Sequence, residues 1–315
     1  FVRDGIFEAN ARGSSLLRPG DETTLNAAAS VNFKSLKYVS VSHDTPLGAN
    51  GTRIGISGAA LATKPVGSNA EGEAWSGSLS ARHPVIRGIR QNLILGASLD
   101  YLNSKNALFG SQLAAERSWI ANANLTWRLN EEKTVLAVRL AGAQGLDIFD
   151  AKIDPLVGEA GFRYVESSVE ANRAIGKRAV LRIAALGRWT ADRLPAAQRF
   201  SVGGATFGRA FDDGLVNGDR GFASFAELAY RPLKTGKLGA SEFYLFGDYA
   251  DVRLLARGAQ PYYRFTLGSA GGGLRLSYSD KATIGVEAAK AWDDPVPGMD
   301  NPWRVAVSWK LSLRP

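Results

Sequence analysis

The chain has 315 residues, a formal net charge of +8, 35 glycines and no cysteine. The absence of cysteine excludes disulfides, cysteine-ligated metals and thiol catalysis. The basic residues are spread along the whole chain and form no single patch, which argues against a nucleic-acid partner.

Alternation of apolar and polar residues is the dominant pattern along the chain. A short first strand is expected near residues 2–9. Clear alternation follows over residues 24–34, 92–103, 121–130, 181–189 and 303–313. In the last of these segments the alternating apolar positions are Trp303, Val305, Val307, Trp309, Leu311 and Leu313. A period of two is typical of strands whose two faces meet different environments.

Such segments recur roughly every 15 to 25 residues and number about sixteen, and no stretch reaches the roughly 18 apolar residues of a membrane-spanning helix. Many run ten or more residues, which suits the roughly 9 to 11 residues of a tilted membrane strand. Aromatic residues gather near segment ends, as in interfacial girdles. We therefore predict an all-β fold over residues 1–315: a transmembrane antiparallel β-barrel of about sixteen strands in the Gram-negative outer membrane. A soluble β-sandwich or propeller is the alternative.

Closure of the barrel is expected from backbone chemistry. An unpaired backbone group in hydrocarbon costs several kcal/mol, so an open sheet edge is unfavourable there. The first and last strands should therefore pair, which favours an even number of strands.

One region, residues 201–221, breaks the alternation with six glycines, three aspartates and two arginines. Its length and glycine content indicate a long hairpin loop. One interpretation is a polar surface loop. The other is a loop that folds back into the lumen over about residues 203–220, with Arg209 at its tip.

These residues carry a resemblance to a known family. The segment Gly208-Arg209-Ala210-Phe211 resembles the Val-Arg-Gly-Phe/Tyr loop signature of the superfamily of outer-membrane assembly and secretion barrels. Two further stretches are similar to motifs of the secretion branch and of the superfamily's neighbouring wall strand. They are Gly218-Asp219-Arg220-Gly221 with Glu227-Leu228, and Phe246-Gly247-Asp248-Tyr249-Ala250. Residues 38–57 and 82–90 are similar to earlier strands of two-partner secretion transporters (TpsB, the haemolysin secretion/activation protein family).

The resemblance implies the barrel domain of a transporter that passes an unfolded exoprotein from the periplasm to the cell surface without ATP. Full-length members carry periplasmic polypeptide-transport-associated domains and often a plug helix, which we expect to lie outside this sequence. Expected partners are the secreted exoprotein, outer-membrane lipid or lipopolysaccharide, and the barrel assembly machinery that inserts the protein. We expect a monomer and no nucleic-acid partner.

The same motifs imply a contact that locks the loop to the wall. By alternation Tyr244, Phe246 and Asp248 face the lumen, where Asp248 would accept a bidentate bond from Arg209. Phe211 and Phe246 complete this expected lock, and Gly208, Gly218, Asp219 and Gly221 belong to the loop motif. The chain departs from the family pattern at Gly208, which replaces valine, and at Ala210 and Ala250, which replace glycine.

Other lumen-facing charges are expected on neighbouring strands. Glu227 either anchors the loop or pairs with a lumen arginine, and the sequence does not choose between these. Four arginines are predicted to line the lumen and to contact the passing chain: Arg128, Arg182, Arg188 and Arg275.

Catalysis finds little support. His43 and His83 have neither metal-ligand spacing nor a neighbouring nucleophile, so we expect no enzyme, no metal and no cofactor. The run Gly271-Gly272-Gly273 does not open a helix, so it is not a phosphate cradle. It is better suited to wall bending or to close approach of a plug. Two other functions remain open: an outer-membrane protein assembly factor, and an anion-preferring diffusive porin.

Overall fold

The computed structural model describes residues 6–67, 69–109, 111–154, 156–233, 236–279, 281–293, 295 and 303–311. Within these ranges the chain forms strands β1 to β17 and one short 3-10 helix, η1. No helix in the same ranges is long and apolar enough to cross a membrane. The expected all-β class is confirmed.

Fifteen strands form one antiparallel sheet. In sheet order they are β1 (Ile6–Ser14), β2 (Glu22–Ser30), β3 (Leu36–Leu47), β4 (Thr52–Thr63), β5 (Ala70–Arg87), β6 (Gln91–Leu108), β7 (Ser111–Asn130), β8 (Thr134–Leu146), β9 (Arg163–Ile175), β10 (Ala179–Trp189), β13 (Arg220–Tyr230), β14 (Glu242–Leu254), β15 (Tyr263–Tyr278), β16 (Ala282–Asp293) and β17 (Trp303–Leu311). Between β10 and β13 lie η1 (Ala196–Gln198), β11 (Phe200–Val202) and β12 (Val216–Gly218).

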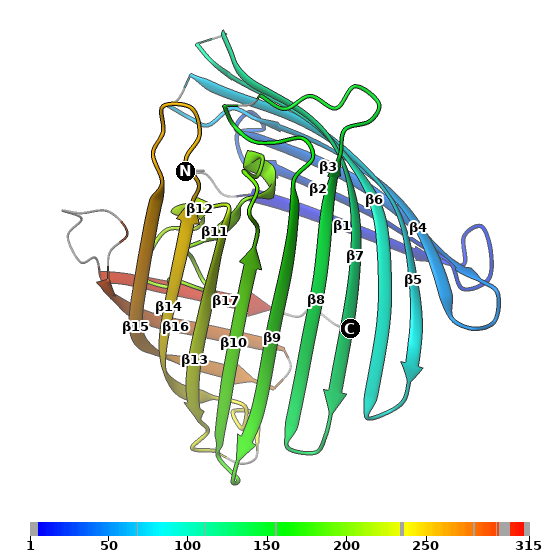
Figure 1. The fold of residues 1–315 in the computed structure, drawn as a ribbon. Coiled ribbons are helices and arrows are strands. Elements are labelled where there is room, and N and C mark those ends of the chain that lie inside the picture. Colours follow the sequence, from blue (N-terminus) through cyan, green and yellow to red (C-terminus); the bar gives the residue numbers. More distant parts are fainter. Residues whose placement is uncertain are drawn as a thin grey trace.

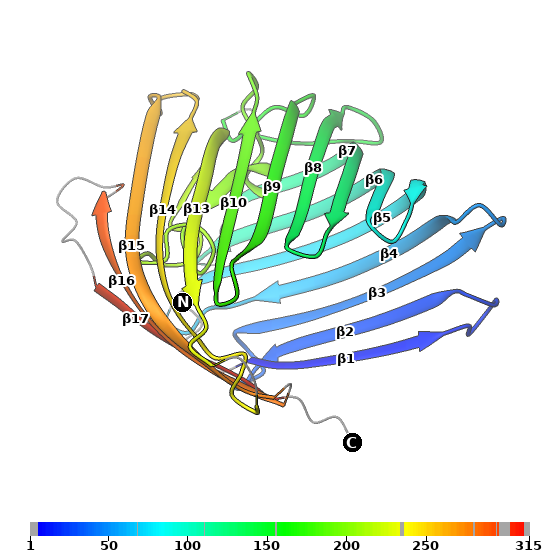
Figure 2. The same cartoon turned by 90° about the horizontal axis from the view of Figure 1, so that it is seen from below.

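The sheet curls around a central lumen, as Figures 1 and 2 show. Its fifteen strands agree with the about sixteen that were expected. The expected pairing of the first and last strands is not among the register pairs of the described residues, where β1 and β17 are the two sheet edges.

Side-chain burial alternates along the strands, which identifies the two faces of the wall. In β14, Tyr244, Phe246 and Asp248 are buried, whereas Phe243 and Leu245 are 55% and 72% exposed. The β17 residues Val305, Val307 and Trp309 are likewise exposed on the outer face. An apolar outer face around a more polar interior is the arrangement of a membrane barrel.

The two ends of the barrel differ in the length of their connections. One end has short turns at residues 48–51, 88–90, 131–133 and 176–178 and one longer connection between β13 and β14, and the other end has the loops at 147–162, 190–219 and 255–262. Outer-membrane barrels place short turns in the periplasm and long loops outside the cell, which orients the chain. Strands β5, β6 and β7 have 18, 18 and 20 residues, so they extend beyond the bilayer.

One predicted strand ends early. The alternation over residues 24–34 predicted a continuous strand, but β2 ends at Ser30, and Phe33 has a φ of 52°. The Asn32 side chain accepts hydrogen bonds from the backbone N–H groups of Lys34 and Ser35 at 2.8 and 2.9 Å. This side chain therefore stabilises a turn, which overrides the apolar alternation of Val31 and Phe33.

Candidate functional site

The connection between β10 and β13 folds onto the concave side of the sheet, where Figure 1 labels β11 and β12. These two strands pair from Phe200↔Gly218 to Val202↔Val216. The buried side chains of Phe200, Val202 and Val216 belong to one apolar cluster with side chains of β13, β14 and β15. The loop is therefore a packed hairpin inside the lumen.

The glycines of the loop motif allow this hairpin to lie flat on the wall. A Cβ atom at Gly218 would be 2.6 Å from the carbonyl oxygen of Arg253, and one at Gly221 would be 2.4 Å from that of Asp251. Gly208 has a φ of 83°, a left-handed conformation that a valine would adopt only with strain. Close packing thus requires glycine at 218 and 221, and the backbone conformation favours it at 208.

Asp248 contacts the loop through the main chain. Its carboxylate accepts hydrogen bonds from the backbone N–H groups of Gly208 at 3.0 Å and of Arg209 at 3.2 Å. The single hydroxyl proton of Ser269 is shared between its two oxygens, which lie 2.8 and 2.7 Å from Ser269 Oγ. The expected bidentate bond from the Arg209 guanidinium to Asp248 is therefore wrong. The short aspartate reaches the loop backbone, whereas the longer arginine side chain extends past it.

The Arg209 guanidinium reaches two glutamates further along the wall. Its Nη1 atom lies 2.9 Å from Glu227 and 3.1 Å from Glu287. Its Cζ atom also lies 4.3 Å from the ring centroid of Phe246 and 5.0 Å from that of Phe225. Arg209 is only 8% exposed, so these contacts are largely screened from water.

Glu227 is shared by three arginines from three elements. It accepts hydrogen bonds from Arg209, from Arg182 at 2.6 Å, and from Arg275 at 2.8 and 3.0 Å. Glu242 joins Arg182 and Arg275 from the other side. Glu227 thus both anchors the loop and pairs with lumen arginines. A cavity of about 400 Å³ borders this network.

Aromatic side chains and glycines complete the anchor. Phe211 is buried, and its carbonyl oxygen accepts a hydrogen bond from Arg304 of β17. A Cβ atom at Gly271 would be 2.8 Å from the ring of Phe246. A Cβ atom at Gly273 would likewise clash with the ring of Tyr244, which packs under the Arg275 guanidinium. The glycine run of β15 therefore makes space for the two aromatic rings below the loop.

The four predicted lumen arginines differ in their surroundings. Arg182 and Arg275 belong to the anchor network. Arg188 pairs with Glu166 and donates to the carbonyl oxygen of Gln198 in the loop. Arg128 is exposed on β7, and alternation places it on the lumen face.

A second buried polar contact holds the hairpin nearer the extracellular end. Asp219 and Arg257 form a fully buried ion pair. The Asp219 carboxylate also accepts the backbone N–H groups of Leu194 and Leu255, each at 2.7 Å. Arg257 donates to the carbonyl oxygen of Val157 at 2.6 Å. One aspartate and one arginine thereby join three extracellular loops to the base of the hairpin.

Sequence reasoning missed several members of the site. Ser269, Glu287 and Arg304 contact the loop and were not singled out, and Arg257 was also overlooked. Glu287 carried a usable signal, because it shares the lumen register of β16 with Gly285 and Ala289, where a glutamate stands out. Among the described residues, no group of three or more His, Asp or Glu side chains is arranged to hold a metal.

An antiparallel sheet with an apolar outer face and a loop anchored in its lumen defines an outer-membrane β-barrel with an internal plug loop. The chain belongs to the haemolysin secretion/activation protein family ShlB/FhaC/HecB, whose family model matches residues 9–276. The wall-strand, loop and hairpin motifs thus identified the family correctly. No curated protein matches the sequence.

Solved structures of similar fold come from two kinds of barrel. CdiB from Escherichia coli has a TM-score of 0.76 at 18% identity, over 96% of this chain and 58% of that one. CdiB from Acinetobacter baumannii has a TM-score of 0.72 at 17% identity, over 98% and 57%. BamA from Haemophilus ducreyi lacking POTRA domains 1-3 has a TM-score of 0.71 at 14% identity, over 97% and 67%. The chain therefore spans a little over half the length of the two CdiB proteins.

Proposed function

We propose that this barrel is the pore through which an unfolded exoprotein passes from the periplasm to the cell surface. Membership of the secretion family supports this function. The transport needs no ATP, and the barrel acts as a monomer after insertion by the barrel assembly machinery. The secreted exoprotein is its partner, no cofactor takes part, and the chain is not an enzyme.

The observation that carries the proposal is the anchored loop. Arg209, Glu227 and Asp248 hold the hairpin against β13 to β16, so the hairpin fills part of a lumen that fifteen strands would otherwise leave open. A pore for a large polymer needs such a plug between transport events, because an open channel would let solutes leak. The arginines of the anchor are paired, so Arg128 and Arg139, which share the lumen face of β7 and β8, contact carboxylates of the passing chain.

The test is secretion by the full-length protein in its native cell. Proteins in the medium that disappear when the gene is deleted identify the exoprotein. Arg209→Ala should reduce its secretion at least tenfold, while heat-modifiable migration shows that the barrel is folded. Arg163→Ala, a change at an exposed arginine outside the lumen network, is the matched control. Normal secretion by Arg209→Ala would contradict the proposal.

An assembly-factor role is the second candidate, because the fold also resembles BamA. An assembly factor handles many clients, so its depletion should lower the abundance of several outer-membrane barrels. A secretion pore should affect one or a few extracellular proteins. Comparing the membrane and medium proteomes after depletion separates the two functions.

A further inference from the structure

A groove of about 560 Å³ runs across β1 to β5. Most of its lining side chains lie on the outer face, in register rows such as Phe7↔Ala29↔Lys37 and Ala27↔Val39. The lumen face of the same strands carries the alternate residues, among them Asn26. The groove is therefore open to the lipid.

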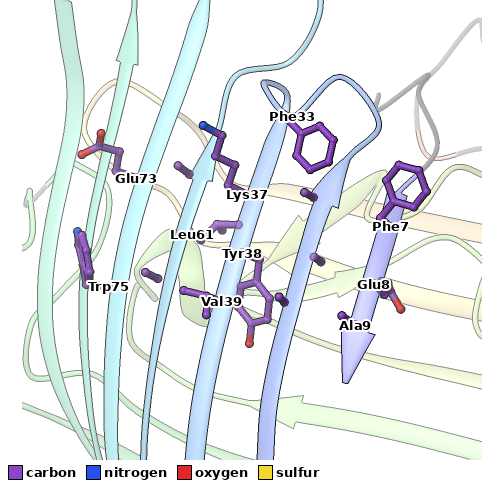
Figure 3. A pocket seen from close by; sticks show the side chains of 15 residues that line it. Phe7, Glu8, Ala9, Phe33, Lys37, Tyr38, Val39, Leu61, Glu73 and Trp75 are labelled. Carbon is purple, nitrogen blue, oxygen red and sulfur yellow. The ribbon is translucent and has the colours of Figure 1, made fainter. Parts of the chain in front are cut away.

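The floor of the groove consists of small side chains between bulky ones. Ala27, Ala29, Ala60 and Ala62 form much of the floor. Phe7 and Phe33, whose rings stack at 6.3 Å, lie on one side, with Trp75 on the other, as Figure 3 shows. A depression of this size accommodates roughly one acyl chain, and hydrocarbon packs favourably against alanine and aromatic carbon.

Charged side chains stand at the extracellular end of the groove. Lys37, Ala62, Glu73 and Lys105 occupy one register row across β3 to β6. Neighbouring strands are about 4.8 Å apart, so the backbone positions of the two lysines are separated by about 14 Å with Glu73 between them. Within the described residues, neither lysine forms an ion pair. The row thus places one lysine on each side of the Glu73 carboxylate, which can accept hydrogen bonds.

We propose that this groove binds lipopolysaccharide through its lipid A end. Lipid A carries phosphates at the two ends of a disaccharide, which matches two lysines separated by several strands. Glu73 accepts hydrogen bonds from sugar hydroxyl or amide groups between them, and one acyl chain fills the alanine floor. The orientation agrees, because the charged row lies on the side of the long loops, where the outer leaflet is. The site is separate from the lumen and from the transport function.

The test is native mass spectrometry of the full-length protein in detergent, with purified bisphosphoryl lipid A, monophosphoryl lipid A and phosphatidylethanolamine as probes. One bisphosphoryl lipid A should bind preferentially. Lys37→Ala and Lys105→Ala should each weaken it about fivefold, the effect of one lysine near an anionic lipid surface. Ala60→Phe should fill the floor and weaken it as well.

Matched controls lie on the outer face of β15 and β16. Lys290→Ala removes an exposed lysine, and Ala270→Phe adds a ring at an exposed alanine, both away from the groove. Neither should change lipid A binding. Equal binding of phosphatidylethanolamine, or unchanged affinity in both lysine variants, overturns the proposal. The lysine variants decide the question even where Ala60→Phe fails to fold, because they leave the apolar pattern intact.

Discussion

Asp248 holds the loop by its main chain. Its carboxylate is 3% exposed, and its partners in the loop are two N–H groups, not a side chain. Such charge-assisted bonds are stronger than neutral ones, and their loss leaves buried donors unpaired. The position of the loop tip thus depends on this carboxylate as well as on the guanidinium of Arg209.

We expect Asp248→Ala to destabilise the docked loop by about 2 to 4 kcal/mol, because two buried N–H groups lose their acceptor. Hydrogen exchange at the amides of Gly208 and Arg209 should accelerate by more than tenfold. Asp213→Ala, at an exposed aspartate of the same loop, should leave both rates unchanged. Equal protection in the two variants would show that the carboxylate does not hold the loop.

Two substitutions at the loop tip separate backbone strain from side-chain chemistry. Gly208→Val restores the residue of the family signature but forces a β-branched side chain into a φ of 83°, with its Cβ 2.8 Å from Leu267 Cδ1. This should cost about 1 to 3 kcal/mol. Ala210→Gly should cost less than about 1 kcal/mol. The rate of protease cleavage of the loop in the folded barrel measures both effects. Faster cleavage of the Ala210→Gly variant than of the Gly208→Val variant would contradict the strain argument.

The sequence predicted which residues take part in the anchor better than it predicted the hydrogen bonds between them. Period-two alternation placed Phe246, Asp248 and Glu227 on the lumen face, because a strand has only two faces. It could not tell which atoms meet, since the partner of Asp248 depends on the backbone course of the long connection at 190–219. Ser269 was missed because a single serine in a glycine-rich strand has no distinguishing pattern.

The three long extracellular loops are joined to one another by buried polar contacts, although loops of this length could move independently. Asp219 and Arg257 bring together the loops at 147–162, 190–219 and 255–262. Removing one partner of a buried ion pair is costly because the other charge is left uncompensated. These loops therefore behave as one unit instead of three independent segments.

Asp219→Ala should release this unit with a cost of about 3 to 5 kcal/mol. The amides of Leu194 and Leu255 lose their acceptor together, so hydrogen exchange should rise at both by a similar factor. Asp212→Ala, at an exposed position, serves as the control. A rise at only one of the two amides would mean that the loops open separately.

The strands themselves were well predicted where alternation was long. The segments at residues 92–103, 121–130 and 181–189 lie inside β6, β7 and β10. The exception is the end of β2, where an asparagine side chain stabilises a turn that hydrophobicity alone does not reveal. The hairpin β11–β12 was not predicted, because three-residue strands are too short to show a period.

For the whole molecule, the anchor is almost electrically balanced. Arg182, Arg209, Arg231 and Arg275 face the carboxylates of Glu227, Glu242, Glu287 and Asp248. The net charge of +8 therefore comes from elsewhere in the chain. Exposed lumen residues, and not the anchor, should determine the ion selectivity of the pore.

Replacing residues 204–214 by a short turn keeps β11 and β12 but removes the plug tip. The single-channel conductance of the full-length protein in planar bilayers should rise several-fold, because a sheet of fifteen strands encloses a wide lumen. Deletion of a turn-sized piece from the loop at 147–162 is the control and should change conductance little. An unchanged conductance in the first variant would show that the loop does not obstruct the pore.

The contact between Asp248 and the loop backbone has a consequence for how this protein can vary. Every amino acid except proline supplies the same N–H group, so a carboxylate that binds N–H groups places few demands on loop side chains. Substitutions at the tip can accumulate as long as the backbone keeps its course. Ala210, where the family signature has glycine, is consistent with such drift. Mutational tolerance should therefore be low at Asp248 and Arg209, and high only at those tip positions whose side chains make no contact with the wall.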